Sequence, residues 1–382
     1  MTPRANAVLL MLIAVGALAV GTTGFVTHAP NRLVTGISIP LWRAAEPQAG
    51  AIAAMGATLL ATAFLPARGW AARLALIAAS ALMLLSLDAA GAAARTLALG
   101  APEAARTLLG PAFWILLLCA ALSILDALQR LEARAAARLG VVTGLAALVA
   151  ALIFTGRLDQ ISLAREFAGR RDAFVSEFVR HCALVAGTLG PALLIGVPLG
   201  LLAARRPRSR APLYAVLNGV QTVPSIALFG LLVGPLAALA SAVPFFAAVG
   251  VHGVGPAPAL IALVLYALLP VARNTEAGLR QVDPAAVEAA FAMGMSHSQV
   301  FWQVELPLGL PVFLAGVRVV TVQTIGLVAV AALVGAGGLG TFVFQGIGQY
   351  AVDLVLIGAV PTILLALAAD FLLSILIERL GR

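Results

Sequence analysis

The sequence predicts an all-α fold, that of a polytopic helical membrane protein with about ten transmembrane helices. Of its 382 residues, 62% are hydrophobic and only 10% are charged, whereas soluble domains carry about a quarter charged residues. The mean hydropathy is high, at +1.05. Apolar stretches of roughly 17 to 25 residues recur, and a helix of that length crosses about 30 Å of hydrocarbon. The alternating segments of about ten residues that mark a membrane barrel are absent from the sequence.

Hydropathy windows predict ten spans in order along the chain. The first covers residues 7 to 26 and is interpreted as a retained span, because it lacks a convincing signal-peptide cleavage site. Residues 211 to 272 contain no Asp, Glu or Arg, and two spans fit this stretch best. The remaining spans are expected near 48 to 65, 71 to 90, 111 to 128, 139 to 155, 181 to 203, 309 to 334 and 353 to 377.

The basic residues predict the orientation of these spans. All 24 are arginine, and with a cytoplasmic N-terminus fourteen of them fall on the cytoplasmic side against nine outside. Both termini are therefore expected in the cytoplasm. The absence of lysine excludes a Walker A loop and a Schiff base in this chain. No basic face is interleaved with aromatic residues, so we expect no nucleic-acid partner.

Composition divides the chain into three segments. Residues 1 to 156 hold about five Ala- and Leu-rich spans without a motif, and residues 181 to 382 place polar and helix-breaking residues in or beside the spans. Such groups at membrane depth are tolerated where they are buried in protein or line a cavity, so the working part is expected in the last segment. Between them, residues 157 to 180 carry apolar residues at helical spacing, which favours an external helix at the membrane interface over a solvated loop. These apolar residues are Leu163, Phe167, Phe174 and Phe178.

A loop at residues 273 to 308, between two spans on the arginine-rich side, has the signals of two short helices. Asp283 is a good N-cap, and Gly294 is placed to end the first helix in the left-handed conformation. Ser296 and Gln299 have the spacing of a capping box, and the second helix is expected to stop before the next proline. One face of the first helix is small and apolar enough to seat in another protein's groove. That face comprises Val287, Ala290, Phe291 and Gly294.

The same loop contains Glu288-Ala289-Ala290, then Gly294 after three residues, and Val304-x-Leu306-Pro307 after nine more. This pattern resembles the EAA loop of ABC importer permeases, with Val304 where isoleucine is usual. The resemblance implies that the loop docks on a separate cytoplasmic ATPase subunit and that none of its residues is catalytic. An ordinary amphipathic loop helix is the alternative.

Further stretches resemble the osmoprotectant branch of these permeases, which imports glycine betaine, choline, carnitine and related quaternary ammonium compounds. The similarity covers about residues 180 to 350 and implies an ABC importer permease core in the C-terminal half. The preceding spans resemble those of long, low-affinity betaine permeases. Methionine-type permeases share the general layout, so an amino-acid substrate stays an alternative. The stretches are Gly196 to Gly200, Gln221 to Leu228, Leu265 to Pro270, Arg273 to Thr275 with Gly278, and Val334 to Gly340.

The resemblance implies a non-catalytic translocation subunit in a bacterial inner membrane, without a cofactor. Its implied partners are the ATPase, an extracytoplasmic substrate-binding protein, a second permease copy or a paralogous permease, and the lipid bilayer. A secondary transporter is the first rival, but intramembrane acids are sparse and no inverted repeat stands out. An intramembrane enzyme is remote, because the sequence has neither H-E-x-x-H nor G-x-S-x-G.

Polar residues within two of the later spans are candidates for the translocation path. They could equally be hydrogen-bonding links between helices, which is the more common role of such groups. Proline at 224 breaks its helix locally and could expose carbonyl groups to a passing cation. The candidates are Gln221, Thr222, Pro224, Ser225, Gln323 and Thr324.

Arg318 and Asp370 lie at similar depths in consecutive spans, on the order of 10 to 13 Å from the cytoplasmic end. We expect them to form a structural salt bridge. The stretch Gly335 to Gly340 matches G-x-G-x-x-G literally, but it follows a membrane span rather than a strand. It is expected to be a turn at the outer end of a span that permits close approach. No histidine has the company of other metal ligands, so no metal site is expected.

Overall fold

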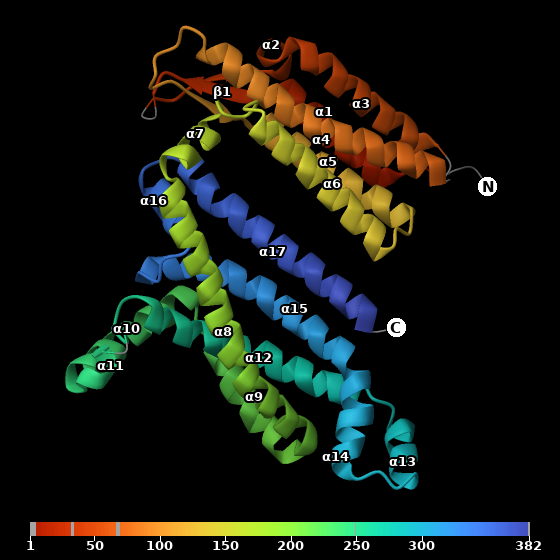
Figure 1. Cartoon of the computed structure of the whole chain (residues 1–382), viewed down its shortest axis with the longest axis vertical. Coiled ribbons are helices and arrows are strands. Elements are labelled where there is room, and N and C mark those ends of the chain that lie inside the picture. The colour runs from red at the N-terminus through yellow and green to blue at the C-terminus, as the bar shows by residue number, and fades with distance from the viewer. Residues whose placement is uncertain (1–4, 32–33, 66–68, 249, 381–382) are drawn as a thin grey trace. The chain divides into compact units, whose positions relative to one another are not determined.

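The computed structural model describes residues 5–31, 34–65, 69–248 and 250–380. The chain divides into two compact units, Met1–Gly169 and Arg170–Arg382. Each unit is a bundle of long helices (Figure 1). Nine helices in the described ranges are long and apolar enough to cross a membrane, and the shorter Ala7–Thr22 is apolar as well. This agrees with the predicted helical membrane fold of about ten spans, two of which lie in residues 211 to 272.

The first unit is a helical bundle with a small sheet at one end (Figure 1). Asn6 caps its first helix, with its side-chain oxygen accepting hydrogen bonds from the amides of Val8 at 3.1 Å and Leu9 at 3.2 Å. In order, the elements are α1 (Ala7–Thr22), β1 (Val26–Ala29), β2 (Ile37–Ile39), α2 (Leu41–Ala44), α3 (Glu46–Phe64), α4 (Gly69–Ala98), β3 (Arg106–Leu109), α5 (Pro111–Arg130), α6 (Ala135–Phe154) and α7 (Ser162–Gly169).

Alanine dominates the core of the first unit. On α4 the buried positions recur every three or four residues and are mostly alanine, which lets neighbouring helix backbones approach closely. Both α3 and α5 pack against α4, and α1 packs against α5. Larger side chains fill the end of the bundle near the sheet, where the rings of Phe25 and Phe113 meet edge to face with centroids 5.8 Å apart.

The sheet was not expected from the sequence. Its strand order is β2-β1-β3, with both pairings antiparallel and Val26 opposite Ile39 on one side and Leu109 on the other. Strands of three or four residues are too short to show an alternating pattern. The connecting segments between α1 and α3, and between α4 and α5, therefore pair with each other to satisfy their backbone groups.

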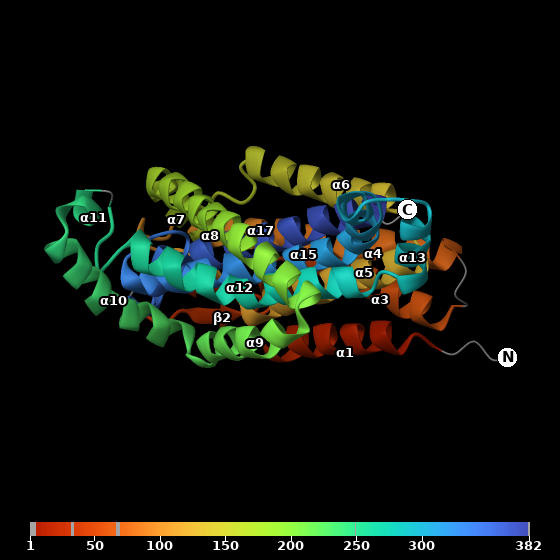
Figure 2. The ribbon, with the colours of Figure 1, turned by 90° about the horizontal axis from the view of Figure 1, so that it is seen from below.

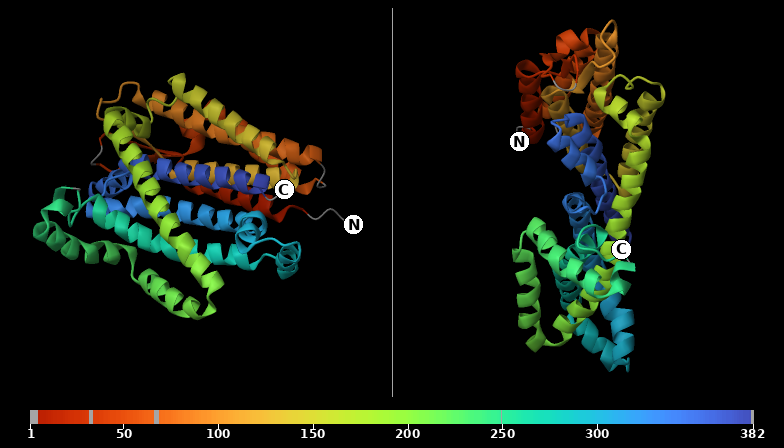
Figure 3. Two further views of the ribbon diagram at one scale, coloured as in Figure 1. Left: turned by 60° about the horizontal axis from the view of Figure 1, so that its bottom comes forward. Right: turned by 90° about the vertical axis from the view of Figure 1, so that its left-hand side faces the viewer.

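In the second unit, α8 packs across α12 and α15, and α17 packs against α15 (Figures 1 and 3). Figure 2 shows α11 and α13 at opposite ends of this unit. The C-terminal end of α17 lies at the same end as α13 and α14 (Figures 1 and 3). The elements are α8 (Arg171–Arg205), α9 (Pro207–Thr222), α10 (Ser225–Ala242), α11 (Pro244–Ala248), α12 (Pro256–Arg280), α13 (Pro284–Ala292), α14 (His297–Val300), the π-helix η1 (Phe301–Glu305), α15 (Leu306–Ala331), the 3-10 helix η2 (Ala332–Val334), α16 (Gly340–Gly348) and α17 (Val352–Leu380).

The segment 157 to 180 is divided between two helices rather than forming one. Its first half includes α7, and its second half is the beginning of the long helix α8. Phe174, near the start of α8, stacks on Phe178 and on Phe342 of α16, with centroid distances of 6.1 and 6.3 Å. The aromatic side chains at this end of α8 thus pack inside the second unit, and an interfacial position for the whole segment stays a prediction.

Candidate functional site

The loop between α12 and α15 folds into two short helices around a glycine. Asp283 caps α13 by accepting a hydrogen bond from the amide of Ala285 at 2.9 Å. Gly294 has φ of +85°, and the following amide of Met295 donates to the carbonyl of Ala290 at 3.2 Å. This hydrogen bond closes the C-terminal turn that a left-handed residue permits. The glycine therefore reverses the chain between α13 and α14.

The second helix of the loop carries the predicted capping box. The backbone amide of Ser296 donates to the Gln299 side chain at 2.8 Å, and the amide of Gln299 donates to the Ser296 hydroxyl at 3.4 Å. Phe291 of α13 meets His297 of α14 edge to face, with ring centroids 4.9 Å apart. This ring contact packs the two short helices against each other.

The exit from the loop differs from the prediction that the second helix stops before Pro307. The chain stays helical, passing from α14 through the π-helix η1 into α15, with Pro307 in the first turn of α15. A π-helix shifts the hydrogen bonds from i→i+4 to i→i+5, so the ladder changes register here. Proline is tolerated in the first turn of a helix, where its missing N–H is not needed. The prediction of a break was therefore wrong.

The residues of the EAA pattern differ in exposure. Glu288, Ala289, Gly294 and Pro307 are exposed, whereas Val304 and Leu306 are half-buried. Ala290 is buried, at 2% exposure, so it does not belong to a face open to a partner, contrary to the expectation for the first helix.

The exposed large apolar side chains of the loop instead include two beside the glycine turn and one on η1. Met293 is 76% exposed and Phe291 is 39% exposed, and Trp302 projects from η1 with 63% exposure. Exposed large apolar side chains are candidates for a surface that another protein covers. We refer to Phe291, Met293 and Trp302 as the loop tip.

The base of the loop is fixed by two glycines that face each other across α12 and α15. A Cβ atom on Gly309 would lie 2.6 Å from the carbonyl oxygen of Gly278, and one on Gly278 would lie 2.8 Å from that of Gly309. Only glycine permits this approach. Beside the crossing, the Gln281 side chain donates to the carbonyl of Leu308 at 3.4 Å. The two helices that carry the loop are therefore locked together where it begins and ends.

Two buried acids, which the sequence analysis did not single out, tie the loop to the end of α8 and to α9. Glu305 of η1 is paired by both of its oxygens with the guanidinium of Arg205, one contact being 3.0 Å. Glu276 of α12 is 3.2 Å from Arg280 and 2.8 Å from Arg210, and it accepts a 2.6 Å hydrogen bond from a tyrosine hydroxyl. That tyrosine is Tyr214.

A signal for one of these acids exists in the sequence. Glu305 is flanked by mainly apolar residues, and a buried charge needs a partner, whereas Glu276 lies in a polar stretch. The arginines lie at the ends of the spans, and their positions in the sequence predict only the orientation of the spans. What the sequence does not show is which arginine meets which acid, because Arg205 and Glu305 are 100 residues apart.

The candidate path residues in α9 and α10 occupy the break between these helices. The Gln221 amide donates to the carbonyl of Tyr266 on α12 at 2.8 Å, and is thus a link between helices. Thr222 bonds within its own helix, to the carbonyl of Gly219 at 2.7 Å. Pro224 is exposed and separates α9 from α10, which Ser225 begins.

The other two candidates lie on α15. Gln323 is exposed, whereas Thr324 is buried at 3% exposure. Among the described residues, no hydrogen bond joins these two side chains to the candidates at the α9–α10 break. The structure thus does not gather the six residues into one hydrogen-bonded site.

Arg318 and Asp370 meet between α15 and α17. The guanidinium Nε lies 2.5 Å from one carboxylate oxygen, and a terminal nitrogen donates to the other at 2.8 Å. This two-pronged geometry is the strong form of an arginine–carboxylate pair.

The glycine-rich stretch between η2 and α16 is a turn packed on the first part of α8. Gly337 and Gly338 have φ of +79° and +86°, and a Cβ atom on Gly337 would lie 2.6 Å from the side chain of Arg180. The amide of Gly338 donates to Glu177, and that of Leu339 donates to the ring of His181 at 3.3 Å. A helix precedes this turn, as expected for a turn of close approach rather than a dinucleotide site.

Nothing in the described ranges gathers three or more His, Cys, Asp or Glu side chains as a metal site would. The buried Glu276 and Glu305 meet arginines and a tyrosine hydroxyl on the loop side, and the half-buried Glu177 accepts a hydrogen bond from the glycine turn. The geometry is that of an exposed loop with an anchored base.

Known proteins resemble both parts of the chain. Residues 4–164 match the family described as "ABC transporter permease YehY, N-terminal domain", and residues 196–382 match "Binding-protein-dependent transport system inner membrane component". The osmoprotectant import permease protein OsmW of Salmonella typhimurium is 40% identical over 194 residues, which are 51% of this chain and 85% of OsmW. The carnitine transport permease protein OpuCB of Listeria monocytogenes is 39% identical over 203 residues, 53% of this chain and 84% of OpuCB. A chain of the inward-facing MetNI methionine ABC transporter matches with a TM-score of 0.48 and 24% identity, covering 55% of this chain and 96% of that one.

Proposed function

This chain belongs to the family of binding-protein-dependent transport system inner membrane components, and from that premise we propose that it is the permease of an importer for glycine betaine, choline or a related quaternary ammonium compound. Family membership makes it a multi-pass inner-membrane protein and a non-catalytic subunit of an ABC transporter, whose ATPase and substrate-binding protein are separate. The substrate class is supported by the printed names of the relatives, which are osmoprotectant and carnitine permeases.

The observation that carries the proposal is the docking loop with its anchored base. In the proposed mechanism the loop tip (Phe291, Met293 and Trp302) and the exposed Glu288 meet the ATPase subunit. Movement of the ATPase then reaches the spans through the Gly278–Gly309 crossing and the Arg205–Glu305 pair. Glu288 acts in docking and not as an acid catalyst.

The orientation follows from the same loop. An ATPase is cytoplasmic, so the loop end of the second unit faces the cytoplasm, and the C-terminal end of α17 lies at that end too (Figure 1). The distribution of arginines supports a cytoplasmic N-terminus as well. With these placements, the sheet end of the first unit and the glycine-rich turn of the second face the outside.

A second permease subunit completes the pathway. Gln323 is an exposed amide on a helix that is long and apolar enough to span the membrane. A polar side chain facing hydrocarbon is costly, so such groups face protein or an aqueous cavity. We place the path along Gln323 and the α9–α10 break at Pro224, between this subunit and its partner. Arg318 and Asp370 hold α15 to α17 as a structural pair.

Uptake measured in proteoliposomes tests the proposal. The chain is reconstituted with its ATPase and binding protein, and labelled glycine betaine, choline and methionine are supplied outside. The proposal predicts ATP-dependent uptake of a quaternary ammonium compound and none of methionine. Uptake of methionine alone would overturn the substrate, and uptake that persists without the ATPase would overturn the mechanism in favour of a secondary transporter.

A further inference from the structure

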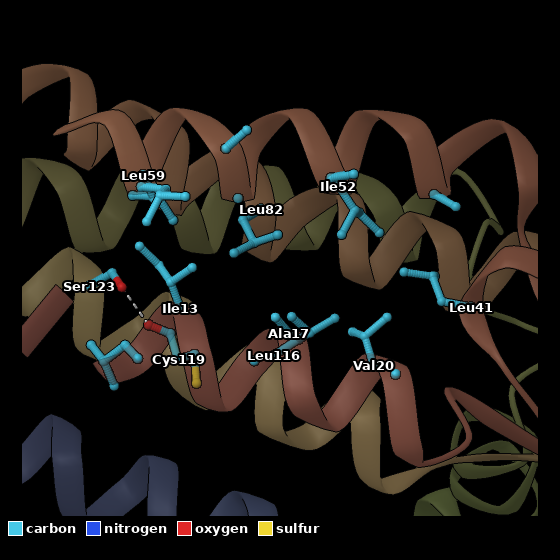
Figure 4. Close-up of a pocket in the computed structure, with 18 of the residues that line it drawn as sticks. Ile13, Ala17, Val20, Leu41, Ile52, Leu59, Leu82, Leu116, Cys119 and Ser123 are labelled. Carbon is cyan, nitrogen blue, oxygen red and sulfur yellow. Dashed lines mark hydrogen bonds between the residues drawn. The ribbon is translucent and has the colours of Figure 1, made fainter. Parts of the chain in front are cut away.

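An apolar groove lies in the first unit between α1 and α3, and the proposed function makes no use of it. Its volume is about 520 Å³. Figure 4 shows Leu82 of α4 and Leu116 of α5 among the side chains around it, and both are buried. The exposed lining residues include the small Ala17 on α1 and Ala53 and Ala57 on α3, and the larger Leu60 on α3. The groove therefore opens sideways from the bundle, toward whatever surrounds the spans.

The groove is closed at one end and capped at the other. The amide of Asn6, at the start of α1, donates to the carbonyl of Ala63 near the end of α3 at 2.8 Å, so the two helices meet there. On α3 the lining extends from Ala49 to Leu60, eleven residue steps. At 1.5 Å per residue this is about 16 Å, close to half of the roughly 30 Å hydrocarbon thickness. The groove is thus about as long as one leaflet of the bilayer is thick.

At the other end of the groove, α2 carries side chains that are typical of a membrane interface. Leu41 and Trp42 of α2 line the groove there, and Trp42 is 50% exposed. Arg43 follows on the same short helix, is exposed, and its guanidinium makes no ion pair among the described residues. Tryptophan and arginine are the residues that sit at the headgroup level of a bilayer.

We infer that this groove binds one acyl chain of a phospholipid, with the lipid phosphate near Arg43. The proposed orientation assigns the lipid to the outer leaflet, and only that leaflet assignment rests on the proposed function. A polar solute is disfavoured because the lining is almost wholly apolar, and the hydroxyl of Ser123 is already bonded to the carbonyl of Cys119 at 2.8 Å. A helix from a second copy is also disfavoured. Such a helix is about 10 Å wide, and it would not fit between α1 and α3, which contact each other.

A leucine that fills the groove tests the inference. A Cβ atom on Gly56, which lines the groove, would meet nothing within 4 Å, and the same holds for Gly144 on α6, which does not line it. Gly56→Leu and the control Gly144→Leu are purified as full chains in detergent, freed of lipid and titrated with dioleoylphosphatidylethanolamine, with bound lipid counted by native mass spectrometry. We expect one tightly bound lipid on the wild type and on Gly144→Leu, and at least tenfold weaker binding to Gly56→Leu.

Two further measurements make the result independent of folding defects. A ligand that binds only the folded state raises its melting temperature, so the lipid should stabilise the wild type but not Gly56→Leu. Should that variant not fold, Ala53→Phe at the exposed rim serves in its place. Arg43→Gln should weaken binding of the phospholipid severalfold and leave binding of dioleoylglycerol, which lacks the phosphate, unchanged.

The contrary results are equally definite. Equal lipid binding by the wild type and the groove-filling variants would place the lipid elsewhere and overturn the inference. A change in oligomeric state of Gly56→Leu with no bound lipid on the wild type would show that a second copy occupies the groove. Neither readout involves transport, so these failures are distinct from a failure of the proposed function.

Discussion

The glycine between the two loop helices decides the direction in which the loop tip points. Gly294 has φ of +85°, a conformation that costs residues with a Cβ atom roughly 1 to 2 kcal/mol. A difference of that size changes a conformational equilibrium by a factor of about 5 to 30. Residues on either side of the glycine contribute the ring contact and the capping box that hold α13 against α14.

Gly294→Val should therefore reduce ATP-dependent uptake by about fivefold or more while the protein still inserts and melts normally. Valine is the sharper test because a β-branched residue is especially strained at positive φ. Uptake in proteoliposomes and the melting temperature are measured together. Gly144→Val on α6 is the control, since its glycine has no positive φ and open space around it. Full uptake by Gly294→Val would show that the turn geometry does not matter for coupling.

Helix caps and the glycine turn could be predicted from the sequence, because they depend on residues close together in the chain. Asp283, Ser296, Gln299 and Gly294 each act within a few residues, and the structure places all four in the roles that their spacing predicts. The burial of Ala290 could not be predicted from the sequence, because it depends on how the whole loop folds back on itself. The predicted face of the first helix therefore included one residue that is not open to a partner.

One ion pair in particular ties the end of the loop to α8. Arg205 ends α8, and Glu305 ends the π-helix that leads into α15. The acid side chain is 10% exposed and the arginine 54%, so solvent screens the pair only from one side. Loss of Arg205 leaves a mostly buried charge without compensation, loss of Glu305 leaves a half-exposed one, and loss of both leaves none.

Glu305→Gln should lower the free energy of unfolding by about 1 to 2 kcal/mol, below the cost of a fully buried pair because Arg205 is half exposed. It should also lower the uptake achieved per ATP hydrolysed. Unfolding in denaturant is followed by the loss of helical circular dichroism. The double variant Arg205→Met with Glu305→Leu should regain most of the lost stability. A single variant as stable as the wild type would mean that the pair contributes little.

At the level of elements, hydropathy located the spans because each one is a long local signal. The three strands were missed, since β1, β2 and β3 have three or four residues each and gain their stability only from pairing with one another. The continuity of α14, η1 and α15 was missed for a different reason. A proline is a strong local signal for a helix boundary, and a shift to π-helical bonding overrides it here.

For the whole molecule, the sequence motifs assigned the second half of the chain to a family before its structure was known, and the first half had no motif to interpret. The structure adds a loop with an anchored base at one end of the second unit and an apolar groove in the first. Long-range pairs such as Arg205 with Glu305 connect residues 100 positions apart, and one sequence cannot show which acid meets which arginine. The substrate and the partner subunits depend on other chains as well.

The central claim, that the loop tip docks on the ATPase subunit, is tested most directly by site-specific photo-crosslinking in the assembled transporter. Met293→Cys, in a chain with Cys119→Ala and Cys182→Ala, is labelled with a benzophenone maleimide and irradiated. Residue 293 is 76% exposed, and Tyr350→Cys, at a 94% exposed position between α16 and α17, is the matched control. The account predicts a covalent adduct with the ATPase from position 293 and none from position 350. An adduct from position 350, or none from position 293 in a transporter that still imports substrate, would contradict it.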